Sequence, residues 1–336
     1  SYIKSSHLEN ERIAGQKITS TLVSVNSGIT SRYITHELFF NNIVITEEHI
    51  KSFYESKDFT QLYENQDIPI HTLPISYKID EKKIVSDPIG HKAQMLTVKW
   101  HVISISKNQL KDIHDLLDAS DLQMKQCVLA SYASSLAAIN EMESSLGVIC
   151  LDINYYKTEV TIIIDDQLVF FDSSDVGLKY VNNDLQSILN VSDEDSDKLR
   201  IKWSNDNSSK NLDESDIRIK QIISSRLEEI IELALKKLKI SKYYDLANSH
   251  VVLTGEGAKH ADIIDLATNI FKTKNIRIGS PQKIHGLKTI IENPSNSTCL
   301  GMLNYALSTE FQFNAKDESD KKKSVLSMLY NFFKAI

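Results

Sequence analysis

The stretch Val251-Val-Leu-Thr-Gly-Glu-Gly-Ala258 decides the fold class of this chain. Its three apolar residues and Thr254 predict a short buried strand, and the Gly-Glu-Gly that follows predicts a sharp turn. Apolar residues then recur at helical spacing from Ile263 to Phe271. Because a helix N-terminus presents free N–H groups, this strand, turn and helix predict a place where a nucleotide or another anion could be held. Glycine turns of this kind are common in α/β folds, so the pattern is weak by itself.

A second stretch, from Gly147 to Thr158, follows the same logic. Its first part predicts a buried strand that ends at Asp152. Residues 160–164 and 168–171 predict two further strands joined by a turn. This hairpin resembles the phosphate-binding hairpin of the actin and sugar-kinase superfamily, in which the Asp holds a magnesium-bound water and the loop holds phosphates.

Size, charge and cysteine content exclude several classes of protein. The 336 residues have room for two to three domains, and the net charge of -7 argues against a general nucleic-acid binder. The three cysteines, Cys127, Cys150 and Cys299, are too scattered for a disulfide framework or a zinc site, and we expect reduced thiols in a cytosolic protein. The chain begins without Met in a predicted helix, so we expect that an N-terminal part of the natural protein precedes it.

The first third of the chain predicts a small α+β unit. Strands are expected at 18–25, in two short runs between 33 and 45, at 75–79 and at 95–105, with a short helix capped by Thr46. We interpret this unit as a structural insertion, because it has no cluster of paired acids. The spacing of His71, His91 and His101 is too irregular to predict a metal site.

Motifs along nearly the whole chain resemble those of FtsA, the bacterial actin homologue of cell division. They are Ile79-Asp80 with Asp87-Pro-Ile-Gly90, Ala133-Ser-Ser-Leu-Ala-Ala138, Glu143-Ser-Ser-Leu-Gly147, Asp175-Val-Gly177, Asp197 with Arg200, Arg226-Leu-Glu-Glu229, Val252 to Ala258, Arg277-Ile-Gly279 with Pro281, and Thr298 to Tyr305. Each match is weak, but their order and spacing agree.

The resemblance implies an α/β, actin-like (ribonuclease H-like) two-lobed fold with an FtsA-type extra α+β subdomain. The domains it implies are a first lobe core at 1–27 and 116–182 (1A), the extra subdomain at 28–115 (1C), a second lobe core at 183–200 and 250–308 (2A), a partner-binding subdomain at 201–249 (2B), a linker at 309–323 and a membrane-targeting helix at 324–336.

It also implies a site for ATP and Mg2+. The positions that correspond to the family's nucleotide contacts are Asp152, Asn154, Lys157, Thr158, Gly177, Asp197, Arg200, Gly255, Glu256, Gly257 and Ala258. No catalytic residue and no resident metal ligand set is assigned.

Two departures from the family pattern affect this site. The family's Asp-Ile-Gly-Gly-Gly-Thr-Thr is replaced by Asp152-Ile-Asn-Tyr-Tyr-Lys-Thr158, and Glu256 stands where the family has glycine. The larger side chains hinder close approach of a phosphate; Lys157 either compensates as a point charge or is a solvated hairpin lysine. The family's opening strands, with the first phosphate loop, have no counterpart here, through truncation or loss. We expect weak or absent ATP hydrolysis, and ATP binding stays open.

A long amphipathic helix is predicted by apolar residues spaced from Ile219 to Leu238. The resemblance implies that this region, subdomain 2B, receives the C-terminal peptide of the tubulin-like FtsZ. We interpret the apolar stripe as core and assign peptide binding to the opposite, basic side, with Arg218, Lys220, Lys236, Lys237 and Lys239.

The end of the chain predicts a linker and an amphipathic helix. Residues 310–323 are polar and charged. Apolar residues then follow at helical spacing behind a triple lysine: Lys321, Lys322 and Lys323, then Val325, Leu326, Met328, Leu329, Phe332, Phe333 and Ile336. We interpret this segment as a helix that lies in a membrane surface, with lysines near anionic headgroups. The alternative is a helix docked on its own protein or on a partner.

Two hypotheses of function follow. The first is an actin-like cell-division protein that polymerises and tethers FtsZ filaments to the cytoplasmic face of the inner membrane at the division site, with other divisome proteins as partners and nucleotide as an assembly ligand. The alternative is an ATP-dependent sugar kinase or a chaperone-type ATPase of the same superfamily. That alternative needs a catalytic Asp in a substrate cleft and intact glycines, and neither is visible.

Overall fold

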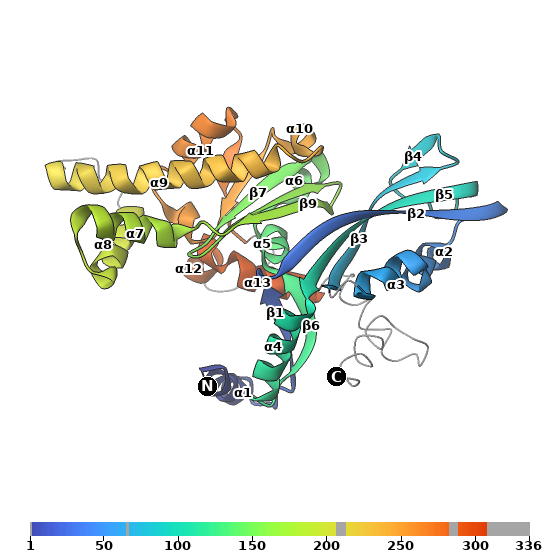
Figure 1. Cartoon of the computed structure of the whole chain (residues 1–336), viewed down its shortest axis with the longest axis horizontal. Helices are drawn as coiled ribbons and strands as arrows, with labels where there is room; N and C mark the ends of the chain where they lie inside the picture. The colour runs from blue at the N-terminus through green and yellow to red at the C-terminus, as the bar shows by residue number, and fades with distance from the viewer. Residues whose placement is uncertain (1, 65–66, 206–212, 282–287, 308–336) are drawn as a thin grey trace. The chain divides into compact units, whose positions relative to one another are not determined.

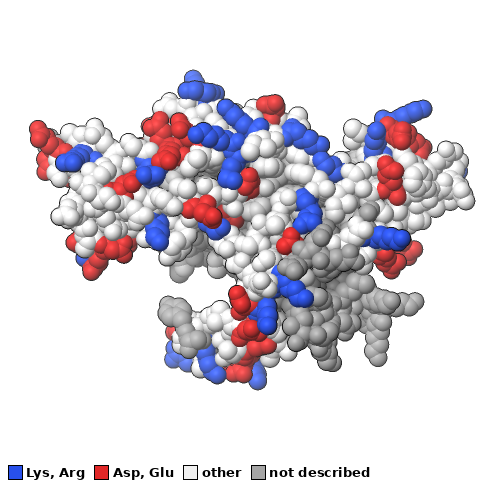
Figure 2. Space-filling view, in the orientation of Figure 1, with Lys and Arg blue, Asp and Glu red and all other residues white. Residues whose placement is uncertain are grey.

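The computed structural model describes residues 2–64, 67–205, 213–281 and 288–307. They form two compact units, divided between Ala130 and Ser131, and the second unit ends at Tyr305 (Figure 1). Figure 2 shows acidic and basic side chains interspersed over the face in view. In the described part of the chain, no helix is long and apolar enough to cross a membrane. The predicted linker and amphipathic tail, 309–323 and 324–336, lie outside the described residues.

The first unit begins with α1 (Tyr2–Ala14), which ends at Gly15, where the backbone takes a φ of 65°. Strand β1 (Ser20–Val25) pairs in parallel with β6 (Gln123–Leu129). The Ser106 hydroxyl caps α4 (Lys107–Asp118) by accepting a hydrogen bond from the Gln109 N–H. A core formed by Val25, Ile68, Ile105, Leu110 and Cys127 lies between these elements.

The extra α+β subdomain is an antiparallel sheet in the order β2-β5-β3-β4. Its strands are β2 (Ile29–Val44), β3 (Asp67–Ile79), β4 (Lys83–Val85) and β5 (Lys92–Ser106). Helices α2 (Glu47–Lys51), η1 (Ser52–Glu55) and α3 (Lys57–Glu64) pack on it. Alternate residues of β2 face a core in which the rings of Phe53 and Trp100 stack at 4.4 Å.

The prediction of two short strands between 33 and 45 is wrong. The segment is one long strand whose register shifts between Phe39 and Ile43, where Asn42 has a positive φ of 53°. Strand β2 pairs with β5, which is nearly as long, and continues past Asn41 and Asn42 as a β-bulge. Local composition does not reveal that the strand continues there.

The second unit contains a five-stranded sheet in the order β11-β10-β7-β8-β9. Strands β7 (Val148–Ile153), β8 (Thr158–Ile164) and β9 (Gln167–Ser174) form the predicted antiparallel hairpins. Strand β10 (Val251–Thr254) pairs in parallel with both β7 and β11 (Ile276–Ile278). Every residue of β7 is buried, as expected for a central strand of a sheet covered on both faces.

This sheet corrects the domain boundaries drawn from the sequence. Residues 116–182 and 250–308 were assigned to different lobes. The structure pairs Thr254 of β10 with Asp152 of β7, so both ranges contribute to one sheet. The assignment was wrong because the pairing joins residues about a hundred positions apart, and local periodicity contains no information on such pairing.

The second unit also contains helices, some of which pack on its sheet. They are α5 (Ala130–Ala138), α6 (Glu141–Leu146), α7 (Leu178–Leu189), α8 (Asp193–Asn205), α9 (Glu214–Leu238), α10 (Tyr244–Ala247), η2 (Glu256–Lys259), α11 (Ile263–Phe271), α12 (Lys288–Ile291), η3 (Pro294–Asn296) and α13 (Ser297–Leu307). The predicted amphipathic helix is confirmed as α9, whose apolar stripe is buried against β8, β9, α7 and α11.

The contact between α5 and α13 depends on Gly301. A Cβ atom at this position would overlap the backbone carbonyl of Ala133. We therefore expect Gly301→Ala to lower the free energy of unfolding by about 3 kcal/mol, the size of a severe overpacking, although alanine is the better helix former.

Urea unfolding followed by circular dichroism measures this change. The control is Leu303→Ala on an exposed position of the same helix, which should change stability by less than about 0.5 kcal/mol. An alanine variant at 301 that is as stable as the original chain would contradict this packing.

Candidate functional site

The loop between β7 and β8 packs against the start of α7. The Asn154 N–H donates to the Lys157 carbonyl at 2.9 Å, which closes the turn. The first N–H groups of α7, those of Leu178 and Lys179, donate to the carbonyls of Asn154 and Tyr155 at 3.0 and 2.8 Å. A Cβ atom on Gly177 would clash with the same carbonyls. Part of the anion-binding capacity of this helix end is therefore used by the loop itself.

The carboxylate of Asp152 lies at the end of β7 and is buried. It accepts hydrogen bonds from Ser134 Oγ at 2.6 Å and from Asn154 Nδ2 at 2.8 Å. Burial raises the pKa of this carboxyl, and the two hydrogen bonds oppose the rise. A Cβ atom on Gly255, whose φ is 81°, would lie 2.5 Å from Asp152 Oδ1 and 2.9 Å from Asn154 Oδ1. Glycine at 255 is therefore required both by its backbone conformation and by close contact.

A second buried carboxyl, that of Glu159, lies directly opposite Asp152 in the β7/β8 register. Directly opposed residues project to the same face of a sheet. Neither carboxyl oxygen of Glu159 has a hydrogen-bond partner, and the nearby Ser131 hydroxyl makes no bond of normal geometry with it. Burial first, and the charge of Asp152 second, raise the pKa of Glu159 well above its ordinary value. Burial therefore favours the neutral form of the Glu159 carboxyl.

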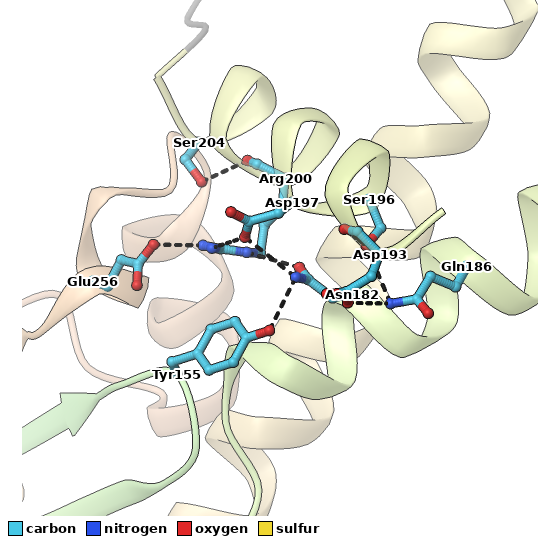
Figure 3. Close-up of polar contacts among 9 residues, drawn as sticks. All are labelled: Tyr155, Asn182, Gln186, Asp193, Ser196, Asp197, Arg200, Ser204 and Glu256. Carbon is cyan, nitrogen blue, oxygen red and sulfur yellow. Dashed lines mark hydrogen bonds and ion pairs between the residues drawn. The ribbon is translucent and has the colours of Figure 1, made fainter. Parts of the chain in front are cut away.

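Arg200 of α8 is the centre of a separate polar cluster (Figure 3). Its side chain is buried, and each of its three nitrogens has a partner. Nε donates to Asn182 Oδ1 at 2.9 Å, Nη1 to Glu256 Oε1 at 2.7 Å and Nη2 to Asp197 Oδ1 at 2.6 Å. Burial disfavours the charge, yet the hydrogen bonds that Arg200 donates to the carboxylates of Glu256 and Asp197 hold the pKa of Arg200 above its ordinary value.

Two residues that the sequence analysis did not select complete this cluster. Asn182 Nδ2 donates to the Tyr155 hydroxyl at 3.3 Å and to Asp197 Oδ1 at 3.2 Å. The guanidinium carbon of Arg200 lies 5.7 Å from the centroid of the Tyr155 ring. The signal that could have identified Asn182 is its position, because it is a polar residue on the otherwise apolar face of α7. We call Tyr155, Asn182, Asp197, Arg200 and Glu256 the Arg200 cluster.

The sequence left two alternatives for Lys157, a point charge that pairs with phosphate and a solvated hairpin lysine. Its ammonium group pairs with Asp175 at 2.6 Å, and this hydrogen bond lowers the pKa of Asp175. The neighbouring Thr158 hydroxyl donates to the Val176 carbonyl at 2.9 Å. The lysine is thus neither a fully solvated side chain nor a cation without a partner. A cavity of about 320 Å³ adjoins it, lined by Tyr156, Lys157, Asp175, Lys179, Tyr180 and Asn183.

The predicted site residues therefore fall into four groups. The first group, Asp152, Asn154 and Gly255, lies at the adjacent ends of β7 and β10. In the second group, ion pairs join Arg200 to Asp197 and to Glu256. The third group, Lys157, Thr158 and Gly177, surrounds the start of α7, and the fourth, Gly257 and Ala258, lies in η2, where Gly257 packs against Ile153. The predicted membrane residues lie outside the described part of the chain.

These side chains do not fit the Mg-nucleotide that the resemblance implies. An incoming polyphosphate would have to displace existing partners, because the guanidinium of Arg200, the ammonium of Lys157 and the amide of Asn154 are already paired. The Glu256 carboxylate adds negative charge at the same place. Among the described residues, His, Cys, Asp and Glu side chains form no group of three or more that could hold a metal ion.

The arrangement of β7 to β11 defines an actin-like fold. Two solved structures are similar to this chain. A PilM-PilN type IV pilus biogenesis complex matches with a TM-score of 0.63 and 12% identity, over 91% of this chain and 85% of that one. MreB 5 of Spiroplasma citri, bound to AMPPNP, matches with a TM-score of 0.50 and 13% identity, over 64% and 68%. The chain is thus an actin-like α/β protein with an additional α+β subdomain.

Family models identify the lineage. One described as an SHS2 domain inserted in FTSA matches residues 15–104, and one described as cell division protein FtsA matches residues 149–301. FtsA of Agrobacterium fabrum is 23% identical over 325 residues, covering 91% of this chain and 73% of its own length. FtsA of Buchnera aphidicola from Acyrthosiphon pisum is 27% identical over 365 residues, covering 100% and 84%. The chain belongs to the FtsA family of cell-division proteins.

The buried Glu159 makes stability depend on pH. Because the pKa of its carboxyl is raised on folding, its favourable contribution is complete below the ordinary value of 4.5 and is lost as the pH rises through the folded pKa. We therefore expect the stability of Glu159→Gln, measured relative to the original chain, to be higher at pH 8 than at pH 5, because Gln does not ionise in the unfolded state.

Urea unfolding at the two pH values measures this difference. Glu232→Gln, at an exposed position of α9, is the matched control and should show no such trend. A relative stability of Glu159→Gln that is equal at both pH values would show that burial does not raise the pKa of this acid.

Proposed function

We propose that this FtsA-family protein acts at the division site as an actin-like tether between FtsZ filaments and the cytoplasmic membrane. The observation that supports this best is the presence, in one chain, of an actin-like sheet and an SHS2-type subdomain that both match FtsA models. Self-association into filaments and contacts with other divisome proteins belong to the same proposal. Its mechanism is mechanical linkage, and no chemical step is assigned to any residue.

Membrane attachment is assigned to residues 324–336 from their sequence pattern. The apolar residues recur at helical spacing, and Lys321, Lys322 and Lys323 precede them. Apolar burial in the acyl boundary and attraction to anionic lipids together bind such a helix. The segment lies outside the described residues, so the proposal rests here on the sequence alone.

Liposome flotation tests this assignment. We expect removal of residues 324–336 to abolish binding to vesicles that contain anionic lipid, and Phe332→Glu to reduce it at least tenfold, because a charge enters the apolar face. Asn331→Glu adds the same charge to the polar face and should have a much smaller effect. Unchanged flotation of the truncated chain would refute the membrane helix and favour the docked alternative.

The FtsZ peptide is assigned to the basic side of α9. Arg218, Lys236 and Lys239 are exposed. Lys220 Nζ lies 5.0 Å from the centroid of the Trp203 ring, and Lys237 Nζ donates a hydrogen bond to Asp172 Oδ1 at 3.0 Å. The end that contains Lys236 and Lys239 therefore has charges available for an acidic peptide, and Figure 2 shows basic side chains gathered toward this end of α9.

A charge reversal tests this surface. We expect Lys236→Glu with Lys239→Glu to weaken binding of the FtsZ C-terminal peptide at least tenfold at low salt, with the effect reduced at 0.5 M salt by screening. The charge-conserving pair Lys236→Arg with Lys239→Arg should bind nearly as the original chain does. Fluorescence anisotropy of a labelled peptide measures both. If the Glu variant and the Arg variant bind the peptide with equal affinity, the peptide site does not lie on this surface.

The alternative of a sugar kinase or a chaperone-type ATPase has less support. Such an enzyme must bind ATP and Mg2+ at the ends of β7 and β10. The side chains there are paired with one another, and Glu256 and Tyr155 occupy positions where the resemblance implies glycine. Turnover of ATP at a rate above 1 per minute, dependent on a second substrate, would favour this alternative over the tether.

A further inference from the structure

We propose that the Arg200 cluster takes the place of a nucleotide in joining α7, α8, the β7–β8 loop and the turn after β10, so that these segments stay together without ATP. This inference goes beyond the tether function, since a tether could work with or without nucleotide. It rests on the contacts of the described residues in the second unit.

The cluster joins four segments that are far apart in the sequence. Tyr155 lies in the β7–β8 loop, Asn182 in α7, Asp197 and Arg200 in α8, and Glu256 in the turn after β10 (Figure 3). The guanidinium of Arg200 in α8 hydrogen bonds to α7 and to the turn after β10, as well as to Asp197 of its own helix, and faces the Tyr155 ring of the β7–β8 loop. A ligand bound at this place would make the same kind of connection between segments.

The cluster is electrostatically complete without a ligand. Arg200 brings one positive charge into a buried position, where it is 4% exposed, and Asp197 and Glu256 bring two negative charges at its edge. A buried charge is tolerated only when it is paired and hydrogen bonded. Since both acids already pair with the guanidinium, a phosphate would have to break an existing ion pair and would meet two carboxylates.

Four backbone N–H groups near the cluster also have internal acceptors. The N–H of Gly255 donates to the Pro294 carbonyl at 3.2 Å, and that of Ala258 donates to the Gly255 carbonyl at 3.3 Å. The N–H groups of Leu178 and Lys179 are bonded to the β7–β8 loop. Glycine turns and helix ends bind phosphate through such groups. Because these four N–H groups already donate to carbonyls of the protein, a phosphate would have to displace those bonds as well as the ion pairs of the side chains.

Tyr155 and Glu256 are the two residues that distinguish this arrangement. They come from different loops, and each extends a large side chain toward the same guanidinium. A single bulky replacement would only obstruct a ligand. Two replacements that meet on one buried cation create new stabilising contacts, which is what a substitute for a ligand must supply.

The first test is nucleotide binding by the natural full-length protein. We expect no saturable binding of a fluorescent ATP analogue with Mg2+ up to 1 mM, and no rise in melting temperature with ATP. Saturable binding with a dissociation constant below 100 μM would overturn the proposal. This result would leave the tether function untouched, since flotation and peptide binding are measured separately.

The second test asks whether the cluster holds the segments together. We expect Glu256→Gln, which keeps the volume and removes the charge, to lower the melting temperature by about 5 °C or more, because a buried cation loses one of its two anions. Hydrogen exchange should then increase in α8 and in the β7–β8 loop but stay unchanged in β9. Glu194→Gln, which breaks the exposed pair with Lys198 on the same helix, is the matched control and should change neither.

The outcome of this pair of variants decides the proposal. A Glu256→Gln protein as stable and as protected as Glu194→Gln would overturn it. If Glu256→Gln does not fold, Arg200→Lys supplies a milder change, which retains the charge but loses the forked geometry. It should increase exchange in α8 and the loop, and normal exchange in that variant would also overturn the proposal.

Discussion

The parallel pairing of β10 with β7 is the constraint on which the rest of the second unit depends. It sets Thr254 beside Asp152, so the turn after β10 and the loop after β7 leave the sheet at the same edge. Close approach there requires glycine at 255 and lets the Asn154 amide bridge to Asp152. The next residue along the turn, Glu256, then reaches Arg200 of α8. One strand pairing thus brings together residues from four segments.

Two buried ionisable side chains of this unit, Arg200 and Glu159, differ in whether the fold stabilises their charged form. Arg200 stays charged because two carboxylates and an amide oxygen satisfy its nitrogens. Glu159 has no hydrogen-bond partner for its carboxyl and lies opposite Asp152, so burial raises its pKa and favours its neutral form. Both outcomes follow from one rule: a buried group keeps its charge only where the fold supplies opposite charge and hydrogen bonds. The Arg200 cluster therefore connects elements, whereas Glu159 weakens its surroundings as the pH rises.

Membership in the FtsA family does not require that the family's loops be retained. Models of FtsA and of its SHS2 domain match this chain, although its identity to the FtsA relatives of Agrobacterium fabrum and Buchnera aphidicola is only 23–27%. Strand and helix patterning tolerates such change because apolar residues of similar volume can replace one another in the core. A loop that contacts a ligand is under a different constraint, and in this chain Asn154, Tyr155 and Tyr156 stand where the resemblance implies glycines. The fold and the chemistry of its cleft can therefore diverge separately.

The sequence by itself determined the local elements and the family. Alternation and helical spacing predicted β7 to β10, α9 and α11, and many weak motifs in order indicated the actin-like fold; Asp152, Arg200 and Glu256 were selected as site residues on the same basis. Only the tertiary structure decided that Arg200 and Glu256 bind each other, that Tyr155 and Asn182 join them and that Lys157 pairs with Asp175. It also placed β7, β8 and β9 in one sheet with β10 and β11, although the sequence analysis had assigned them to different lobes. The reason is physical: periodicity reports which face of a segment is buried, whereas the partner of a buried polar group depends on which distant segments the strand pairing brings together.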